Sequence, residues 1–422
     1  MHSSDVSETI TVQGRSTGPD RKTFAFLVVT VLLSSLGGTI FLPVMPFIAQ
    51  EYTRNQGDLA LVVGWLVTIY SIFQLLAAPT LGALSDHFGR RPLLLICLIG
   101  SAIGYALFGI GGALWVLFLS RAIDGLTGGN FSILFAYIGD TAPAEERGKY
   151  FGLFGALSGA GFIVGPAIGG FASELGYAVP VYIAFGLTVV SVVWGYFYLP
   201  ESLSKEHRSE QITLPQLNPL TQFRKLFAIV QLRWLLLAIF LFALPFAIMQ
   251  ANIAVLVKDS LNWNADTIGP IFSVVGVVDI LMQGVLIGRL LPMFGEIKLT
   301  VGGLVCVAGA YLLLGVIALI PSPLLVFGGV ALFAVGTGLL EPSLSGLLSR
   351  AAGPRQQGIV QGGSQSIQSL AMIIGPLLGG ILYTQINHAV PYWVGIGFVA
   401  LAIIATFLAT PVLRANQAAD QA

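Results

Sequence analysis

The chain has 422 residues, of which 55% are hydrophobic and only 9% charged, and its formal net charge at pH 7 is zero. Soluble domains carry about 25% charged residues, so this composition excludes a soluble globular protein and gives no sign of a nucleic-acid partner. The apolar residues come in stretches of about 20 or more, the length that crosses the hydrocarbon core of a bilayer. The sequence therefore predicts a multi-pass membrane protein.

The segments follow one another in a simple order. The first residues are polar and rich in Ser and Thr, without the layout of a cleaved signal, so we expect a soluble tail. Apolar segments follow, the fourth of them over Leu114–Gly139, and the polar interval Pro200–Arg233 divides them six and six. We predict an all-α membrane protein with 12 transmembrane helices in two pseudo-symmetric six-helix halves. The expected divisions are 1–23 (cytoplasmic tail), 24–199 (first bundle), 200–233 (cytoplasmic linker), 234–412 (second bundle) and 413–422 (cytoplasmic tail).

Basic residues predict the orientation, because cytoplasmic loops retain Lys and Arg. With both termini inside, the outer loops receive only Arg54 and Lys258 of the 20 basic residues, and Arg121 lies within a span. The opposite topology would invert this distribution. We therefore expect a multi-pass protein of a bacterial plasma membrane with both termini in the cytoplasm.

An internal repeat relates the two halves. The stretch RGKYFG…GPAIGG from Arg147 matches QGIVQG…GPLLGG from Gln357, so that Gly and Pro positions coincide at an offset of 210 residues. Two halves of the same orientation imply an axis along the membrane normal, with a substrate path between them and alternating access. For the later copy, Gly375–Gly380, we expect tight helix packing only.

The stretch GALSDHFGRRP places charge between two apolar segments. Gly82 would let the second span approach a neighbour, and Gly89 can take the positive φ of a tight turn. Arg90 and Arg91 suit a cytoplasmic turn on topogenic grounds alone. Asp86 is not explained in that way, because a carboxylate near apolar surface is costly unless it is paired.

These motifs resemble those of a known family. GALSDHFGRRPLLL resembles the loop motif between spans two and three of the major facilitator superfamily, and RAIDGLTGG resembles its fourth-span arginine motif. GLFGALSGAGFIVGPAIGG resembles the fifth-span motif of its antiporters, and LPES after span six is typical of it. Within that superfamily the chain looks most like the twelve-helix drug:H⁺ antiporters, close to tetracycline efflux pumps. It departs from them in the first span, where Ser34 and Ser35 replace an acidic residue, and in the ninth.

The resemblance implies roles for several residues. It implies a conformational latch in which Asp86 faces the beginning of span eleven and Arg90 reaches Asp140. The residues of this latch are Gly82, Asp86, Gly89, Arg90, Arg91 and Asp140. It also links the fifth-span glycines to antiport, where close approach to the other half would make a hinge or seal; packing alone is the alternative. The residues of this antiporter motif are Gly155, Gly159, Gly161, Gly165, Pro166, Gly169 and Gly170.

Four ionisable residues remain inside spans: Arg121, Asp124, Asp279 and Glu341. Each would cost about 2.5–3.5 kcal/mol at a helix centre facing lipid, so all four should face the interior. Arg121 and Asp124 lie at i, i+3 and can pair, either as a structural ion pair or as a proton-coupling site. Asp279 has no basic partner in its own span. We rank Asp124, then Asp279, then Glu341 as proton carrier; for Glu341 a buried structural hydrogen bond is the alternative.

Polar and aromatic residues near the middle of the expected cavity-lining spans are candidates for substrate binding. They are Tyr70, Gln74, Asn130, Phe131, Gln250, Asn252, Gln361, Gln365 and Gln368. A few polar groups among apolar walls suit an amphiphilic organic molecule. Each of these residues could instead only bridge two helices.

We therefore expect a monomeric secondary active transporter, a proton-coupled exporter of hydrophobic or amphiphilic drugs, whose partners are the bilayer, protons and a small-molecule substrate. The alternatives are an exporter or facilitator of a metabolite, siderophore or lipid, and a non-transporting receptor. An enzyme is not expected, because no His lies at membrane depth and neither HExxH nor GxSxG occurs. We expect no cofactor, no metal and no catalytic residue.

Overall fold

The computed structural model describes residues 21–142, 146–204, 206, 208, 232–352 and 357–420, and this part of the chain is almost entirely helical, with no strand. The helices of the first half are α1 (Arg21–Thr39), α2 (Met45–Tyr52), η1 (Gln56–Asp58), α3 (Leu59–Phe88), α4 (Arg90–Ile110), α5 (Leu114–Thr127), α6 (Asn130–Thr141), α7 (Arg147–Ala172), η2 (Ser173–Leu175) and α8 (Val179–Tyr198). Those of the second half are α11 (Arg233–Leu261), α12 (Ala265–Leu281), η5 (Met282–Leu286), α13 (Ile287–Phe294), α14 (Glu296–Ile317), α15 (Pro323–Ala352), α16 (Gln357–Gln385) and α17 (Val390–Asp420).

Within the described residues, 11 helices are long and apolar enough to cross a membrane. The fourth expected span is different, because it is divided into α5 and α6 at Gly128 and Gly129. Two successive glycines are poor helix formers, and the interruption leaves neither piece long enough to span alone. The pair α5–α6 thus takes the place of the continuous segment that was expected.

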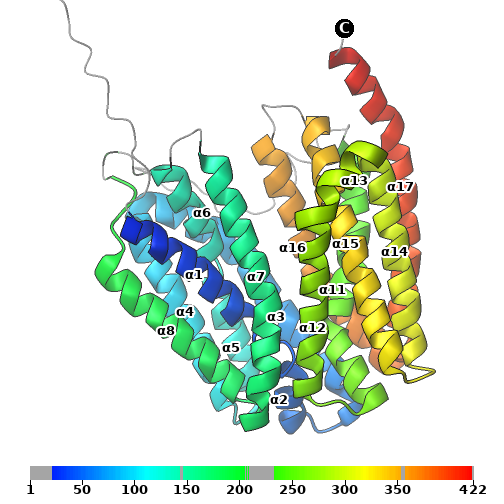
Figure 1. Ribbon diagram of the computed structural model, residues 1–422. Coiled ribbons are helices and arrows are strands. Elements are labelled where there is room, and N and C mark those ends of the chain that lie inside the picture. Colours follow the sequence, from blue (N-terminus) through cyan, green and yellow to red (C-terminus); the bar gives the residue numbers. More distant parts are fainter. Residues whose placement is uncertain are drawn as a thin grey trace, which may run out of the picture.

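The two ends of the helix bundle are marked by glycine turns. α3 and α4 meet at Gly89, with φ of 111°, and α13 and α14 meet at Gly295, with φ of 76°. The positive φ expected at Gly89 is confirmed. We call this end, at the top of Figure 1, the Gly89 end, and the opposite end, where α4 stops at Gly111, the Gly111 end.

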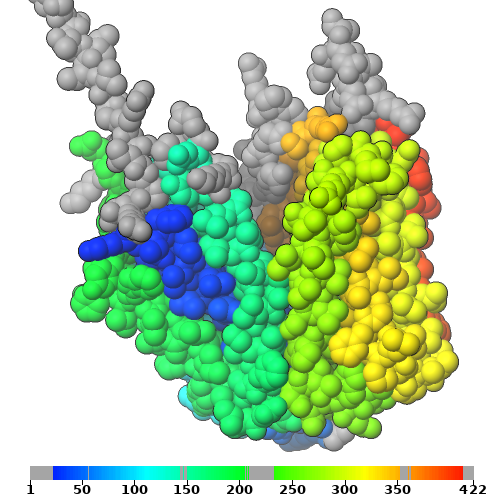
Figure 2. Space-filling view, viewed as in Figure 1, coloured from blue at the N-terminus to red at the C-terminus, as the bar shows by residue number. Residues whose placement is uncertain are grey.

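The halves pack together at the Gly111 end and diverge toward the Gly89 end. The larger apolar core is continuous across both halves, joining Ile40 and Leu66 to Leu235 and Val255. Toward the Gly89 end, the first half has a separate core around Tyr137. Figure 2 shows the corresponding cleft between the first half (blue to green) and the second (yellow-green to red).

Two helix crossings, α3 with α16 and α7 with α12, close the Gly111 end. A Cβ on Gly64 of α3 would lie 2.5 Å from the carbonyl oxygen of Pro376, and one on Gly269 of α12 would lie 2.7 Å from that of Pro166. At the first crossing, the Thr68 hydroxyl also donates a hydrogen bond to the backbone oxygen of Ile373 at 3.0 Å. Glycine is required at both crossings because the two backbones are in contact.

The prediction that Gly82 allows close helix approach is wrong. A Cβ at this position would meet nothing within 4 Å. Gly82 lies in the part of α3 near the Gly89 end, where the halves have separated and none of the described residues approaches this face.

Candidate functional site

A cavity of about 1140 Å³ lies between the two halves, on the Gly89 side of the crossings. It is lined by α1, α3, α5, α6 and α7 of the first half and by α11, α12, η5, α15 and α16 of the second. Val67 and Met372, the chain neighbours of Thr68 and Ile373, line the cavity, so the inter-half hydrogen bond lies close to it. The wall combines apolar and aromatic side chains with polar groups from both halves, a composition that suits a site for an organic molecule.

The expected pair Arg121–Asp124 forms on α5. An Arg121 Nη1 lies 3.2 Å from Asp124 Oδ2, and both side chains are almost fully buried. The guanidinium lies over the ring of Phe41, with Cζ 4.5 Å from its centroid, and over that of Phe108, at 4.8 Å. The arrangement cancels the formal charge locally while both residues still line the cavity.

Gly104 allows α4 to pack against this pair. A Cβ there would lie 2.9 Å from Asp124 Cβ, so α4 and α5 are in backbone contact at the level of the carboxylate. The position of Asp124 is therefore fixed by a helix contact as well as by its ion pair.

Asp279 and Glu341 reach the cavity from the second half, on α12 and α15. Asp279 is half-buried and accepts a hydrogen bond from the Thr337 hydroxyl at 3.4 Å, while the side chain of Gln283 also bonds to it. Glu341 is exposed to the cavity and close enough to Asp279 for the two charges to repel each other. The structure thus brings all four predicted ionisable residues to one cavity.

A π-helical segment, η5, begins three residues after Asp279 and contains Gln283. Single π-helical turns occur often at functional sites, because the extra residue changes which side chains share a face. Here the π-helical segment η5 lies directly beside the carboxylate of Asp279.

The predicted substrate-binding residues divide into two groups. Tyr70, Gln74, Phe131, Gln250, Gln365 and Gln368 line the cavity, and Gln74 Nε2 donates to the Tyr70 hydroxyl at 3.0 Å. Asn130 and Asn252 are buried away from it; the Asn130 side chain accepts the Phe131 N–H at 2.9 Å. The side chain of Gln361 lies outside the described part of the chain.

Several lining residues were missed by sequence reasoning. Phe246, Phe272 and Phe333 form an aromatic wall in the second half, and the rings of Phe246 and Phe333 stack with centroids 5.8 Å apart. Gln283 could have been found as the i+4 neighbour of Asp279. Thr337 could not, because it approaches Asp279 only through tertiary packing.

The glycines of the fifth-span motif face two different surroundings. Gly155 and Gly159 face the cavity, and a Cβ on either would meet nothing within 4 Å. Gly161 and Gly165 pack against α1, and Gly169 packs against Ile40 and Pro43 in the turn that follows it. The expectation that they touch the other half is therefore wrong for these three glycines.

The contact with the other half is made by Pro166 and Gly170. A Cβ on Gly170 would lie 2.8 Å from Gly269 Cα. In the later copy, Gly380 packs in the same manner against Ala60 and Leu61 of α3, so the repeat carries an inter-half contact there too, and not only the packing that was expected.

The predicted latch residues gather at the Gly89 end. Arg90 forms ion pairs with Asp86 and with Asp140, the latter with Nε 3.0 Å from Oδ2, and its Nη1 donates to Ser85 Oγ at 2.6 Å. The expected link from Arg90 to Asp140 is therefore present. Asp86 is half-exposed and pairs with Arg90; among the described side chains no contact joins it to α16.

Glu201, which sequence reasoning missed, caps the beginning of α4. Its carboxylate accepts the backbone N–H of Arg90 at 2.8 Å and that of Arg91 at 3.3 Å. Arg91 also donates to the backbone oxygen of Tyr196. A carboxylate at a helix N-terminus satisfies otherwise unpaired N–H groups and interacts favourably with the helix dipole. The signal was the LPES stretch.

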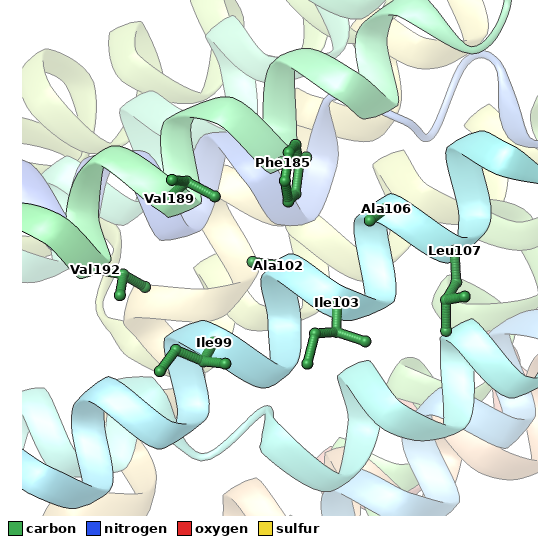
Figure 3. A pocket seen from close by; sticks show the side chains of 8 residues that line it. All are labelled: Ile99, Ala102, Ile103, Ala106, Leu107, Phe185, Val189 and Val192. Atoms are coloured by element: carbon green, nitrogen blue, oxygen red, sulfur yellow. The ribbon is translucent and has the colours of Figure 1, made fainter.

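A second concavity, of about 330 Å³, lies between α4 and α8 and is drawn in Figure 3. Its lining is entirely apolar: Ile99, Ala102, Ile103, Ala106, Leu107, Phe185, Val189 and Val192. Without polar groups it cannot orient a polar substrate, so the central cavity is the candidate site.

Two helical halves around one central cavity of mixed polarity define a membrane transporter. A model of the Major Facilitator Superfamily matches residues 27–373, and the chain belongs to that family. It is a transporter with several membrane-spanning helices and not an enzyme, and proteins of this family handle small-molecule substrates.

The chain is similar to resistance proteins over nearly its whole length. Tetracycline resistance protein, class B, of Escherichia coli is 32% identical over 394 residues, covering 91% of this chain and 95% of that protein. Multidrug resistance protein 2 of Bacillus subtilis (strain 168) is 27% identical, with 89% and 92% covered. The crystal structure of the human organic anion transporter MFSD10 (TETRAN) has the same fold, with a TM-score of 0.69 at 24% identity, covering 92% of this chain and 99% of that one.

Proposed function

We propose that this protein is a proton-coupled exporter of hydrophobic or amphiphilic drugs that works by alternating access. One observation carries the proposal: a large cavity, closed at the Gly111 end, brings Arg121, Asp124, Asp279 and Glu341 together. Relatives that are named as tetracycline and multidrug resistance proteins support the drug as cargo. The predicted division at residues 200–233 separates the two moving halves.

We further propose that the Gly89 end faces the cytoplasm of a bacterial cell, because Lys and Arg concentrate in the loops at that end. The described conformation is then open to the inside, and drugs would enter from the cytoplasm. Cysteines introduced at Gly82 and at Glu174 test this orientation. A membrane-impermeant maleimide applied to intact cells should label the second position and not the first; the reverse result contradicts it.

In this function, protonation of Asp124 would be coupled to its contact with Arg121. Loss of the carboxylate charge weakens the ion pair, and the guanidinium can then turn toward another partner as the cavity changes exposure. Asp279 and Glu341 would take up and release protons, or bind a charged group of the substrate, in the same cavity.

The decisive experiment is efflux from proteoliposomes under an imposed pH gradient, with a panel of dyes and antibiotics that includes tetracycline. Gradient-driven accumulation should occur in wild-type vesicles and be abolished by Asp124→Asn, with Glu174→Gln as a control at an exposed position. Transport that is equal with and without the gradient would identify a facilitator, and no transport of any compound would contradict the proposal.

The latch is tested by Asp86→Asn. We propose that Asp86, Arg90 and Asp140 hold the cytoplasmic side closed in the outward-open state, and that the Arg90–Asp140 pair persists when that side opens. Asp86→Asn should abolish transport without reducing expression. Undiminished transport by this variant would contradict the latch.

A further inference from the structure

A basic side chain lies where the two halves touch at the Gly111 end. Lys258 stands in the last turn of α11 and directly follows Val255, Leu256 and Val257, three fully buried residues of the core that joins the halves. The side chain of Lys258 is only 16% exposed. A largely buried ammonium group is costly unless it has partners, so the contacts of Lys258 indicate what holds it there.

The ammonium group of Lys258 contacts the first half through an aromatic ring. Its Nζ lies over the ring of Phe47 on α2, 6.0 Å from the ring centroid, the distance up to which a cation is attracted by a ring face. Phe47 is buried, and its ring stacks on that of Tyr177 with centroids 4.9 Å apart. Lys258 therefore joins the second half to an aromatic pair of the first half, at the bottom of Figure 1.

Two further residues of the second half restrict the position of this lysine. Lys258 Nζ lies 3.7 Å from Oδ1 of its neighbour Asp259, and the Tyr383 hydroxyl on α16 donates a hydrogen bond to Asp259 Oδ2 at 2.9 Å. The ring of Tyr383 is buried and stacks on that of His388, with centroids 4.3 Å apart. These contacts join α11 to α16 within one half, so they can persist when the halves separate.

The contact between Lys258 and Phe47, by contrast, depends on the conformation. Tyr383 lies one turn after Gly380, the glycine of α16 that packs against Ala60 and Leu61 of α3. The cluster is therefore next to an inter-half crossing that must come apart if the Gly111 end opens. Lys258 would then leave the ring of Phe47 while its contact with Asp259 remains.

We propose that Lys258 and Phe47 form a latch that holds the Gly111 end closed, and that Asp259 and Tyr383 are positioning residues for the lysine. We call it the Lys258 latch. It rests on the proposed function only in the opening of the Gly111 end during alternating access. It adds the residues that set how often this end opens, and it requires neither a drug nor a proton.

The distance between the halves at the Gly111 end tests the latch directly. Spin labels would be attached to Leu175→Cys in the first half and Leu324→Cys in the second, two positions that are 82% and 80% exposed, after Cys97→Ala and Cys306→Ala remove the native thiols. Double electron–electron resonance of the full chain in lipid nanodiscs then gives the closed and open populations. Lys258→Met keeps an apolar stem and removes the charge. It should raise the ratio of open to closed molecules by about two- to thirtyfold.

Further variants separate a latch from a merely structural lysine. Phe47→Leu should raise the ratio to a similar degree, and the double variant with Lys258→Met should raise it no further, because both changes remove the same contact. Lys258→Arg should restore the wild-type ratio, since a guanidinium also packs on aromatic rings.

The positioning role has its own test and control. Tyr383→Phe keeps the stacked ring and removes only the hydroxyl, so it should raise the ratio by about two- to tenfold and have no effect when Lys258→Met is already present. The control is Arg54→Met, which removes a basic charge from an exposed position two residues after α2 and should leave the ratio unchanged.

Failure of the latch can be told apart from failure of the proposed function. The inference is overturned if Lys258→Met leaves the ratio unchanged or shifts it no more than Arg54→Met, if the effects of Lys258→Met and Phe47→Leu add, or if Lys258→Arg opens as far as Lys258→Met. None of these measurements involves transport. If the ratios change as expected while no pH gradient drives efflux, the latch stands and only the proposed function is contradicted.

Discussion

The two halves of this transporter share their backbone contacts but not their charges. Gly64 packs against the carbonyl of Pro376 just as Gly269 packs against that of Pro166, so each half supplies a glycine to one crossing and a proline carbonyl to the other. The closed end of the cavity is therefore built twice from one repeated element.

The chemistry of the cavity is not repeated. At the offset of 210 residues, Ala331 and Ala334 occupy the positions of Arg121 and Asp124. The first half thus holds a compensated ion pair, whereas the second holds two carboxylates without a cationic partner among the described residues. The repeat therefore preserves the surfaces where the halves touch, whereas the ionisable residues that line the cavity differ between the two walls.

Substitution at the crossings should have the largest effect. Gly64→Leu and Gly269→Leu place a side chain where the backbones touch, so the Gly111 end cannot close, and each variant should lose transport almost completely. Proteoliposome efflux measures this loss. Gly397→Ala on α17 is the control, because among the described residues its methyl group would meet nothing within 4 Å. If only one crossing were sensitive, the structural equivalence of the halves would not extend to function.

The fifth-span contact with α1 gives a related prediction. Gly165 packs against Leu36 and Thr39 within one half, so Gly165→Leu should block the transport cycle by distorting that half. Gly186→Ala on α8, where a methyl group would meet nothing within 4 Å among the described residues, should retain transport. A functional Gly165→Leu protein would show that the α1–α7 contact need not be tight.

Neutralising Asp124, which is in an ion pair, should affect the stability of the protein more than neutralising Asp279, which is not. Asp124→Asn leaves the guanidinium of Arg121 buried without a counter-charge and should lower the free energy of unfolding by about 3–5 kcal/mol. Asp279→Asn removes no counter-charge and should leave thermal stability unchanged while reducing transport. Thermal unfolding in detergent compares the two. Equal destabilisation would contradict the contrast between the walls.

The smallest effect is expected at Thr337. Thr337→Val removes the hydrogen bond to Asp279 and should weaken substrate binding or transport by about two- to tenfold, equivalent to 0.5–1.5 kcal/mol. Thr188→Val is the matched control, because among the described residues the Thr188 hydroxyl bonds only to the Ala184 carbonyl of its own helix. If both variants behave alike, the Thr337 hydroxyl does not orient the carboxylate.

Much of the candidate site could be predicted because membrane burial makes charge informative. Arg121, Asp124, Asp279 and Glu341 stood out among apolar residues, and their cost in lipid required that they face inward. Uncharged polar residues carried less information, because such a side chain can lie in a contact between two helices just as well as in a cavity. Asn252 shows this, because it was predicted to bind substrate but is buried away from the cavity.

The sequence by itself determined the membrane-spanning segments, the two-fold repeat and the charges that must avoid lipid, because each follows from hydrophobicity along the chain. Only the tertiary structure decided which glycines touch the other half, which end is closed, and that Thr337 approaches Asp279. Those features depend on how helices distant in sequence pack against each other, and no local pattern records that packing.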